Sequence, residues 1–146
     1  MLDELTYAKE MLRRGGYTLF LCNEGKVTFS EERGIKPLLA LAETSEWHGA
    51  FAADKIVGKA AAMLYSLMGV RAVYAEVMSE PAKEMLKRHG IRAECETLCG
   101  NIINRSGNGL CPMEQAVLEL DDPKDSLGAI HKKIQQLSQK SHLIFS

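Results

Sequence analysis

Residues 59–78 contain two adjacent stretches that would have almost no polar face in a helix or a strand. Residues 59–68 (KAAAMLYSLM) are apolar on nearly every side of a helix, so this helix should be central and buried. After Gly69, residues 70–78 (VRAVYAEVM) form a nearly continuous apolar run, typical of a strand covered on both faces of a parallel or mixed sheet. This combination predicts a three-layer α/β/α fold.

The preceding residues predict a helix, a hairpin and a second helix. Apolar residues recur at helical spacing up to Gly15-Gly16, and residues 17–22 (YTLFLC) and 26–30 (KVTFS) then flank a short turn that contains glycine. Residues 35–46 suggest a short helix, with Pro37 in its first turn. The segment from Gly49 to Ala53 is expected only to lead into the buried helix.

The C-terminal half continues the alternation. Ser79-Glu80-Pro81 is typical of a helix start, residues 91–99 alternate as a strand, and further helices begin near Cys111 and at Asp121. The chain is therefore expected to form a single domain, residues 1–146, with a mixed sheet of about four or five strands. The role of residues 138–146, a frayed tail or an oligomer contact, is left open.

Composition excludes several classes of function. Eighteen basic and nineteen acidic residues give a formal charge of −1, which argues against nucleic acid as a partner. No apolar run reaches the roughly 18 residues of a membrane-spanning helix, and the first residues do not resemble a secretory signal. A cytoplasmic protein without membrane contact is expected.

The cysteines do not predict a metal site. Cys95 and Cys99 form a C-x3-C pair, but no second pair follows at a suitable spacing and the four histidines are scattered. We expect four reduced thiols, no bound metal and no cofactor.

One candidate site is the start of the buried helix. Gly58-Lys59 invites comparison with a phosphate-binding loop, but that pattern needs glycine at position 53 and a hydroxyl residue at position 60, where this chain has alanine. A nucleoside-triphosphatase is therefore not expected. A looser hypothesis makes Asp54, Lys55, Gly58 and Lys59 one side of an anion pocket. The alternative is a local cap, close packing at Gly58 and two lysines in solvent.

A second candidate site surrounds the next proline-containing helix start. A loop rich in glycine and asparagine leads from Asn104 and Arg105 to Cys111, with Glu114 three residues later. A helix start can lower the pKa of a thiol, so Cys111 is a candidate nucleophile, although no histidine is near it in sequence. A ligand-lining loop and a purely structural plug, with Glu114 supporting the cap, are the alternatives.

Four stretches carry a resemblance to a known family: residues 16–21 (GYTLFL), 54–62 (DKIVGKAAA), 79–81 (SEP) and 104–114 (NRSGNGLCPME). In these stretches the chain resembles a small prokaryotic domain of unknown function with a cytidine deaminase-like fold. Zinc deaminases open the helix after the hairpin with His-x-Glu or Cys-x-Glu, and the next with Pro-Cys-x-x-Cys. Matching helix starts places Val57-Gly58-Lys59 and residues 81–85 at these motifs, so the metal ligands and the catalytic glutamate are absent.

The resemblance implies that the cavity survives without its zinc. The first hypothesis is a zinc-free domain that binds a small anionic ligand, such as a nucleotide derivative, with Lys59 supplying the positive charge. The second is an enzyme that uses Cys111 or Lys59 in chemistry without zinc. The third is an interaction module, such as a homodimer, with a vestigial pocket.

Overall fold

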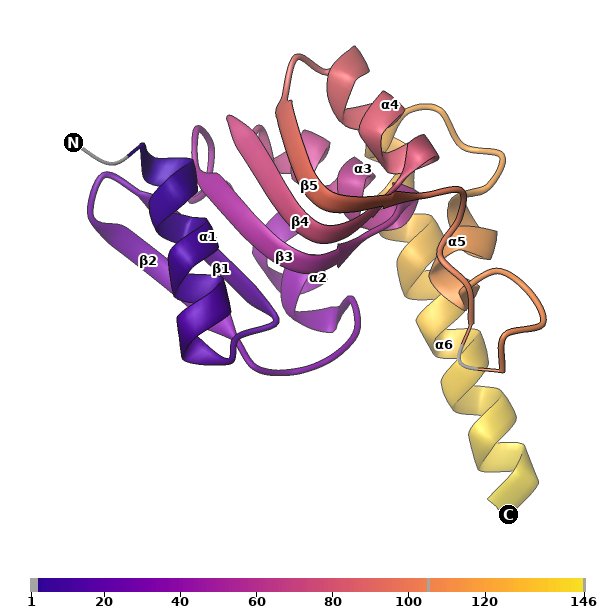
Figure 1. The fold of residues 1–146 in the computed structure, drawn as a ribbon. Helices are drawn as coiled ribbons and strands as arrows, with labels where there is room; N and C mark the ends of the chain where they lie inside the picture. The colour runs from indigo at the N-terminus through magenta and orange to yellow at the C-terminus, as the bar shows by residue number, and fades with distance from the viewer. Residues whose placement is uncertain (1–2, 105, 146) are drawn as a thin grey trace.

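The computed structural model describes residues 3–104 and 106–145, which form one mixed five-stranded sheet with helices on both faces (Figure 1). The strands are β1 (Leu19–Asn23), β2 (Lys26–Ser30), β3 (Phe51–Val57), β4 (Ala72–Ser79) and β5 (Arg92–Cys99). The helices are α1 (Glu4–Gly15), α2 (Lys36–Ala42), α3 (Lys59–Met68), α4 (Glu80–Arg88), α5 (Pro112–Val117) and α6 (Ser126–Phe145), with a 3-10 turn at Pro123–Asp125.

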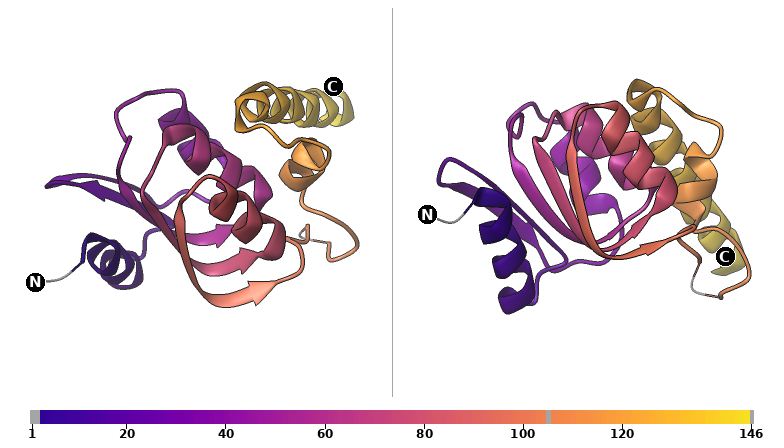
Figure 2. Two further views of the ribbon diagram at one scale, coloured as in Figure 1. Left: turned by 90° about the horizontal axis from the view of Figure 1, so that it is seen from above. Right: turned by 45° about the horizontal axis from the view of Figure 1, so that its top comes forward.

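The strand order is β2-β1-β3-β4-β5. The hairpin strand β1 pairs antiparallel with both β2 and β3, whereas β3, β4 and β5 run parallel. Helix α1 covers one face of the sheet and the remaining helices lie on the other, as the two views of Figure 2 show. The predicted three-layer arrangement is confirmed.

Strand β3 occupies the centre of the sheet, where only a lead-in to the next helix was expected. Its buried residues Ala52 and Ala53 are small, and the polar pair Asp54-Lys55 interrupts the apolar pattern, so the segment lacks the usual signature of a central strand. The correction places a strand between the two helices that follow the hairpin. The helix that directly follows the hairpin is α2, and α3 is the one after it.

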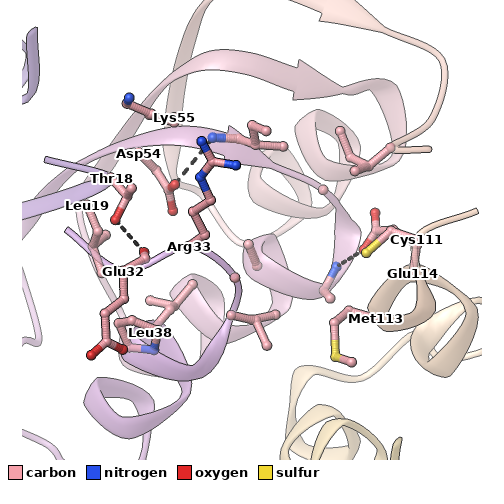
Figure 3. Close-up of a pocket in the computed structure, with 18 residues that line it drawn as sticks. Thr18, Leu19, Glu32, Arg33, Leu38, Asp54, Lys55, Cys111, Met113 and Glu114 are labelled. Carbon is pink, nitrogen blue, oxygen red and sulfur yellow. Dashed lines mark hydrogen bonds between the residues drawn. The ribbon is translucent and has the colours of Figure 1, made fainter. Parts of the chain in front are cut away.

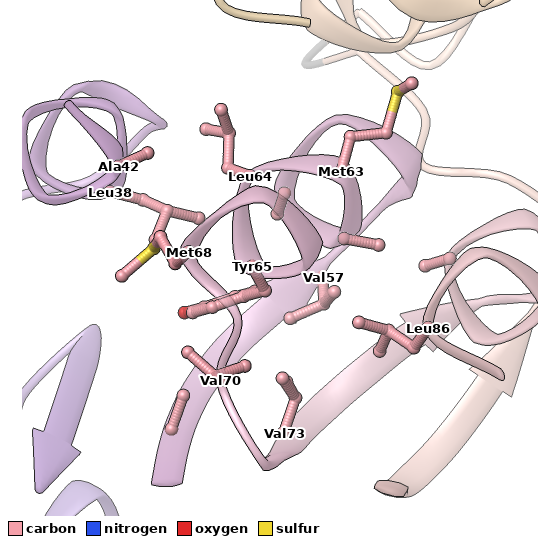
Figure 4. Close-up of a cluster of buried hydrophobic side chains, with 14 of the residues drawn as sticks. Leu38, Ala42, Val57, Met63, Leu64, Tyr65, Met68, Val70, Val73 and Leu86 are labelled. Atoms are coloured by element: carbon pink, nitrogen blue, oxygen red, sulfur yellow. The ribbon is translucent and has the colours of Figure 1, made fainter. Parts of the chain in front are cut away.

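Helix α3 is the centre of the larger core, as its apolar sequence predicts. Tyr65, Leu64 and Met63 are fully buried, and Figure 4 shows α3 surrounded by side chains from α2, β4 and α4. Burial of a side chain of this size contributes about 1.5–3 kcal/mol. A smaller cluster on the other face packs α1 against β1, β3 and β4 through residues that include Leu12 and Phe20.

Helix starts and stops follow local rules. The hydroxyl of Ser79 accepts a hydrogen bond from the backbone N–H of Ala82 at 3.2 Å, which confirms the predicted start of α4. Gly69 ends α3 with φ of 72°, a left-handed conformation that suits glycine. Within the described residues, no helix is both long and apolar enough to cross a bilayer.

Candidate functional site

A cavity of about 530 Å³ opens between the start of α2, the end of β3 and the starts of α3 and α5 (Figure 3). Its walls are mainly apolar, and the polar side chains that line it come from four separate segments. The apolar lining consists of Leu19, Ile35, Pro37, Leu38, Ile56, Ala60, Ala61, Ile102 and Met113. The polar and charged lining consists of Thr18, Glu32, Arg33, Asp54, Lys55, Cys111 and Glu114.

Asp54 lies on β3 with its carboxylate on the α3 side of the sheet. Its Oδ2 accepts a hydrogen bond from the hydroxyl of Tyr65 at 2.7 Å, and its Oδ1 accepts one from the backbone N–H of Ile56 at 3.3 Å. Burial raises the pKa of Asp54 to about 7, and the hydrogen bonds that its carboxylate accepts offset only part of that effect. Asp54 is therefore a carboxyl group that exchanges its proton near neutral pH.

The polar pair Asp54-Lys55 does not act as a unit. Neighbouring residues on a strand point to opposite faces of the sheet: Ala52 belongs to the core beneath α3, and Ala53 to the core beneath α1. Lys55 is exposed, and Figure 3 shows its ammonium pointing away from the other lining side chains. The cavity therefore receives the carboxylate of this pair without its amine.

The start of α3 already holds an anion, the carboxylate of Glu114. Oε1 accepts a hydrogen bond from the backbone N–H of Lys59 at 2.6 Å, and Oε2 accepts one from that of Ala60 at 2.9 Å. Glu114 is only 9% exposed, and burial raises its pKa, although the two N–H donors and the charge of Lys59 act in the opposite direction. Glu114 was expected either to belong to the ligand site or to support the cap of its own helix. It lines the cavity, and its carboxylate caps α3 from α5.

Lys59 lies outside the cavity that it was expected to charge. Its ammonium donates a hydrogen bond to the carbonyl of Leu118, at the end of α5, at 3.1 Å. Gly58 lines the cavity with an ordinary φ of −96°, and its lack of a side chain leaves room for Glu114 and Ile102. The two expected sources of anion affinity at this helix start, its N–H groups and Lys59, are both engaged within the protein.

The loop before α5 contributes less to the cavity than expected. The side chain of Asn104 pairs with Asn108, its backbone N–H bonds Gly109, and it does not line the cavity. Arg105 lies outside the described residues. Cys111 does line the cavity as the N-cap residue of α5, and no histidine of the described chain joins it there.

Two residues of the site were missed in the sequence. Arg33 lies in the segment between β2 and α2 and lines the cavity, and Tyr65 holds Asp54 from within α3. The sequence around Arg33 does not mark it as a site residue, because it is one of several charged residues in the loop between β2 and α2. Tyr65 does give a signal in the sequence, because a buried tyrosine in an otherwise apolar helix needs a partner for its hydroxyl group.

Strand β3 also changes which helix starts of this chain are to be compared with the zinc motifs of the deaminases. The starts of α2 and α3, not those of α3 and α4, are the first two helix starts after the hairpin. They carry Gly34-Ile35-Lys36 and residues 57–61 (VGKAA), which contain no cysteine or histidine. No group of three histidine, cysteine, aspartate or glutamate side chains in the described chain is placed to hold a metal ion.

The fold and the cavity together define a three-layer α/β domain with a preformed pocket of small-molecule size. The sequence matches the family TM1506, a domain of unknown function (DUF1893), over residues 7–134. The chain belongs to this family. It is similar to the crystal structure of a DUF1893 family protein, TM1506, from Thermotoga maritima, with a TM-score of 0.82 and 26% sequence identity over 91% of this chain and 92% of that one. No curated protein matches it.

Proposed function

We propose that this domain binds a small anionic molecule, such as a nucleotide derivative, in the cavity between α2 and α3 without the help of zinc. The cavity is the observation that carries the proposal. At about 530 Å³ it lies within the range of roughly 300–1,000 Å³ that small-molecule sites occupy. Mainly apolar walls with a few polar groups from separate segments suit a flat ring system with a polar edge.

The positive charge for such a ligand comes from Arg33. Its exposed side chain lines the cavity, and no carboxylate lies within 4.0 Å of it among the described residues. A guanidinium group suits a phosphate or carboxylate because it can donate two parallel hydrogen bonds. This assignment replaces Lys59, whose ammonium is bound to Leu118.

The strand order supports a cytidine deaminase-like topology. The hairpin lies at one edge, β1 runs antiparallel to its neighbours, and three parallel strands are connected through α3 and α4. The cavity lies between the first two helix starts after the hairpin, where a deaminase-like fold would bind its base. This support is an analogy of fold and leaves the identity of the ligand to experiment.

The test is a thermal-shift screen of the wild-type protein with nucleosides, nucleotides and inorganic phosphate at one salt concentration. A ligand at about 100 times its dissociation constant adds about 2.7 kcal/mol of stability, which moves the melting temperature by several degrees. Arg33→Gln should reduce the shift, whereas Arg88→Gln, at the end of α4 and outside the cavity, should retain it. No shift with any compound would contradict the proposal.

One observation favours an enzymatic alternative. Cys111 lines the cavity and is partly exposed, so a bound molecule would meet its thiol. A neighbouring base normally activates such a nucleophile, and none of the histidines in the described chain lines this cavity. We therefore place ligand binding first, and the homodimer stays a prediction.

A further inference from the structure

We infer that Asp54 selects the ligand of the cavity by accepting a hydrogen bond from an amino group on its ring, as an aminopurine or aminopyrimidine base carries. The inference rests on the proposed function and adds the chemistry of the part of the ligand that enters the cavity. Its basis is the arrangement of Asp54 and Tyr65 at the β3 wall.

The carboxylate of Asp54 is fixed in one orientation. One oxygen is held by Tyr65, which is itself fully buried, and the other by the backbone N–H of Ile56. A carboxylate has about four acceptor positions, so these two bonds leave further positions open. Because Asp54 lines the cavity, a bound molecule can reach them.

The carboxylate of Asp54 forms no ion pair among the described residues. Among the described residues, no lysine, arginine or histidine lies within 4.0 Å of Asp54, and Lys55 points to the other side (Figure 3). A partly buried charge without an ion-pair partner costs stability, and an apolar residue would serve packing alone better. A ligand that donates a hydrogen bond to one of the open acceptor positions adds a third partner to the two that hold Asp54.

The surroundings of Asp54 determine how its ligand affinity depends on pH. Tyr65 faces it from α3, and β1 and β4 place Leu19 and Ala75 beside it. The other charged lining residues are Glu32, Arg33 and Glu114, together with Lys55, whose ammonium points away from the cavity. Burial raises the pKa of Asp54 to about 7. An amino donor binds the ionised form best, so its affinity should rise with pH through about 7, whereas a ligand carbonyl would need the protonated acid and show the reverse.

Matched pairs of nucleotides test the inference. Adenosine monophosphate is compared with purine riboside monophosphate, which lacks only the amino group, and cytidine monophosphate with uridine monophosphate, by calorimetry with wild-type protein. The amino member of each pair should bind about tenfold more tightly on the alkaline side of pH 7. The preference should shrink on the acidic side. Both members carry the same phosphate, so its own titration cancels in the ratio.

Variants assign the preference to Asp54. Asp54→Asn should remove the preference and its pH dependence, whereas Glu76→Gln, a partly buried carboxylate on β4 outside the cavity, should keep both. Tyr65→Phe removes a hydrogen bond that lowers the pKa of Asp54, so the pH midpoint should move upward. This variant retains Asp54 and tests the inference even where Asp54→Asn does not fold.

The outcomes separate the two proposals. Equal affinities within each pair, or a midpoint that Tyr65→Phe leaves in place, would overturn the role of Asp54 and leave the binding function intact. If none of the four nucleotides binds the wild-type protein, the role of Asp54 in selecting a base is wrong, and the binding function is then decided by the wider thermal-shift panel. A preference for purine riboside and uridine monophosphates that weakens as pH rises would show that Asp54 acts as a donor and would also overturn the inference.

Discussion

Gly58 and Glu114 approach each other so closely that a Cβ atom at residue 58 would collide with Oε1 of Glu114. The contact joins α3 to α5 and brings the carboxylate onto the first N–H groups of α3. The glycine that suggested a phosphate-binding loop is therefore needed for a contact within the protein.

Gly58→Ala should destabilise the protein by about 1–3 kcal/mol, because the methyl group must displace Glu114 or Ile102. The measurement is the free energy of unfolding in urea. Gly100→Ala is the matched control, since a Cβ there meets no atom within 4 Å, and it should change the free energy by less than about 0.5 kcal/mol. Equal effects of the two variants would exclude a special role for the contact.

Glu114→Gln should cost about 1–3 kcal/mol of stability. An amide offers only one acceptor oxygen to the two N–H groups and turns its own donor toward the other, so one buried donor loses its partner. Chemical denaturation of this variant is compared with that of Glu119→Gln, an exposed residue near the end of the same segment. A variant as stable as the wild type would show that Glu114 contributes little as a cap.

Lys59→Gln should leave ligand binding unchanged. The ammonium of Lys59 bonds the carbonyl of Leu118 and does not line the cavity, so its removal should cost less than about 1 kcal/mol of stability. The readout is the ligand-induced shift in melting temperature, measured beside Arg33→Gln. If Lys59→Gln loses the ligand-induced shift and Arg33→Gln retains it, Lys59 and not Arg33 binds the ligand, as the sequence suggested.

The stability of the wild-type protein should fall as pH rises from about 4 to about 7 through the contribution of Asp54. Its pKa rises from 3.8 in the unfolded reference to about 7, so the folded state binds more protons than the unfolded state in this window. We expect a loss of about 2 kcal/mol. This is less than the whole pKa shift would give at about 1.4 kcal/mol for each pH unit, because Asp54 is partly exposed and solvent screens its charge. Asp54→Asn should flatten this part of the curve in denaturant unfolding measured across pH, and an unchanged slope would assign it to other groups.

Alkylation by iodoacetamide should modify Cys22 last among the four thiols. Cys22 is 2% exposed, and burial raises the pKa of its thiol to about 11, so little thiolate forms or meets the reagent. Mass spectrometry of the time course should show Cys111, Cys95 and Cys99, which are partly exposed, modified earlier. If Cys111 reacts far faster than Cys95 and Cys99, the enzymatic alternative gains support.

The sequence predicted the elements better than the site. Helical spacing, the Gly25 turn and the Ser79 cap are local signals, and the structure confirms the hairpin, α3 and α4. Strand β3 was missed because alanine fills the crowded centre of the sheet and Asp54 breaks the apolar run.

The contacts that define the site join residues far apart in the chain. Glu114 reaches Lys59 across 55 residues, and Arg33 shares the cavity with Cys111 only through the fold. Local patterns carry no information about such contacts, whereas the hydroxyl of Tyr65 was a readable sign that a polar partner lies within the core.

The cap on α3 also imposes an order on events during synthesis. The residue that completes the N-terminus of α3 is translated 55 positions after the helix begins, when β4, α4 and β5 have already been made. A ribosome-bound chain that stops before residue 114 therefore holds its most apolar helix with two unsatisfied N–H groups at its first turn. The first two N–H groups of the central helix receive their carboxylate acceptor only when one of the last elements to be made arrives.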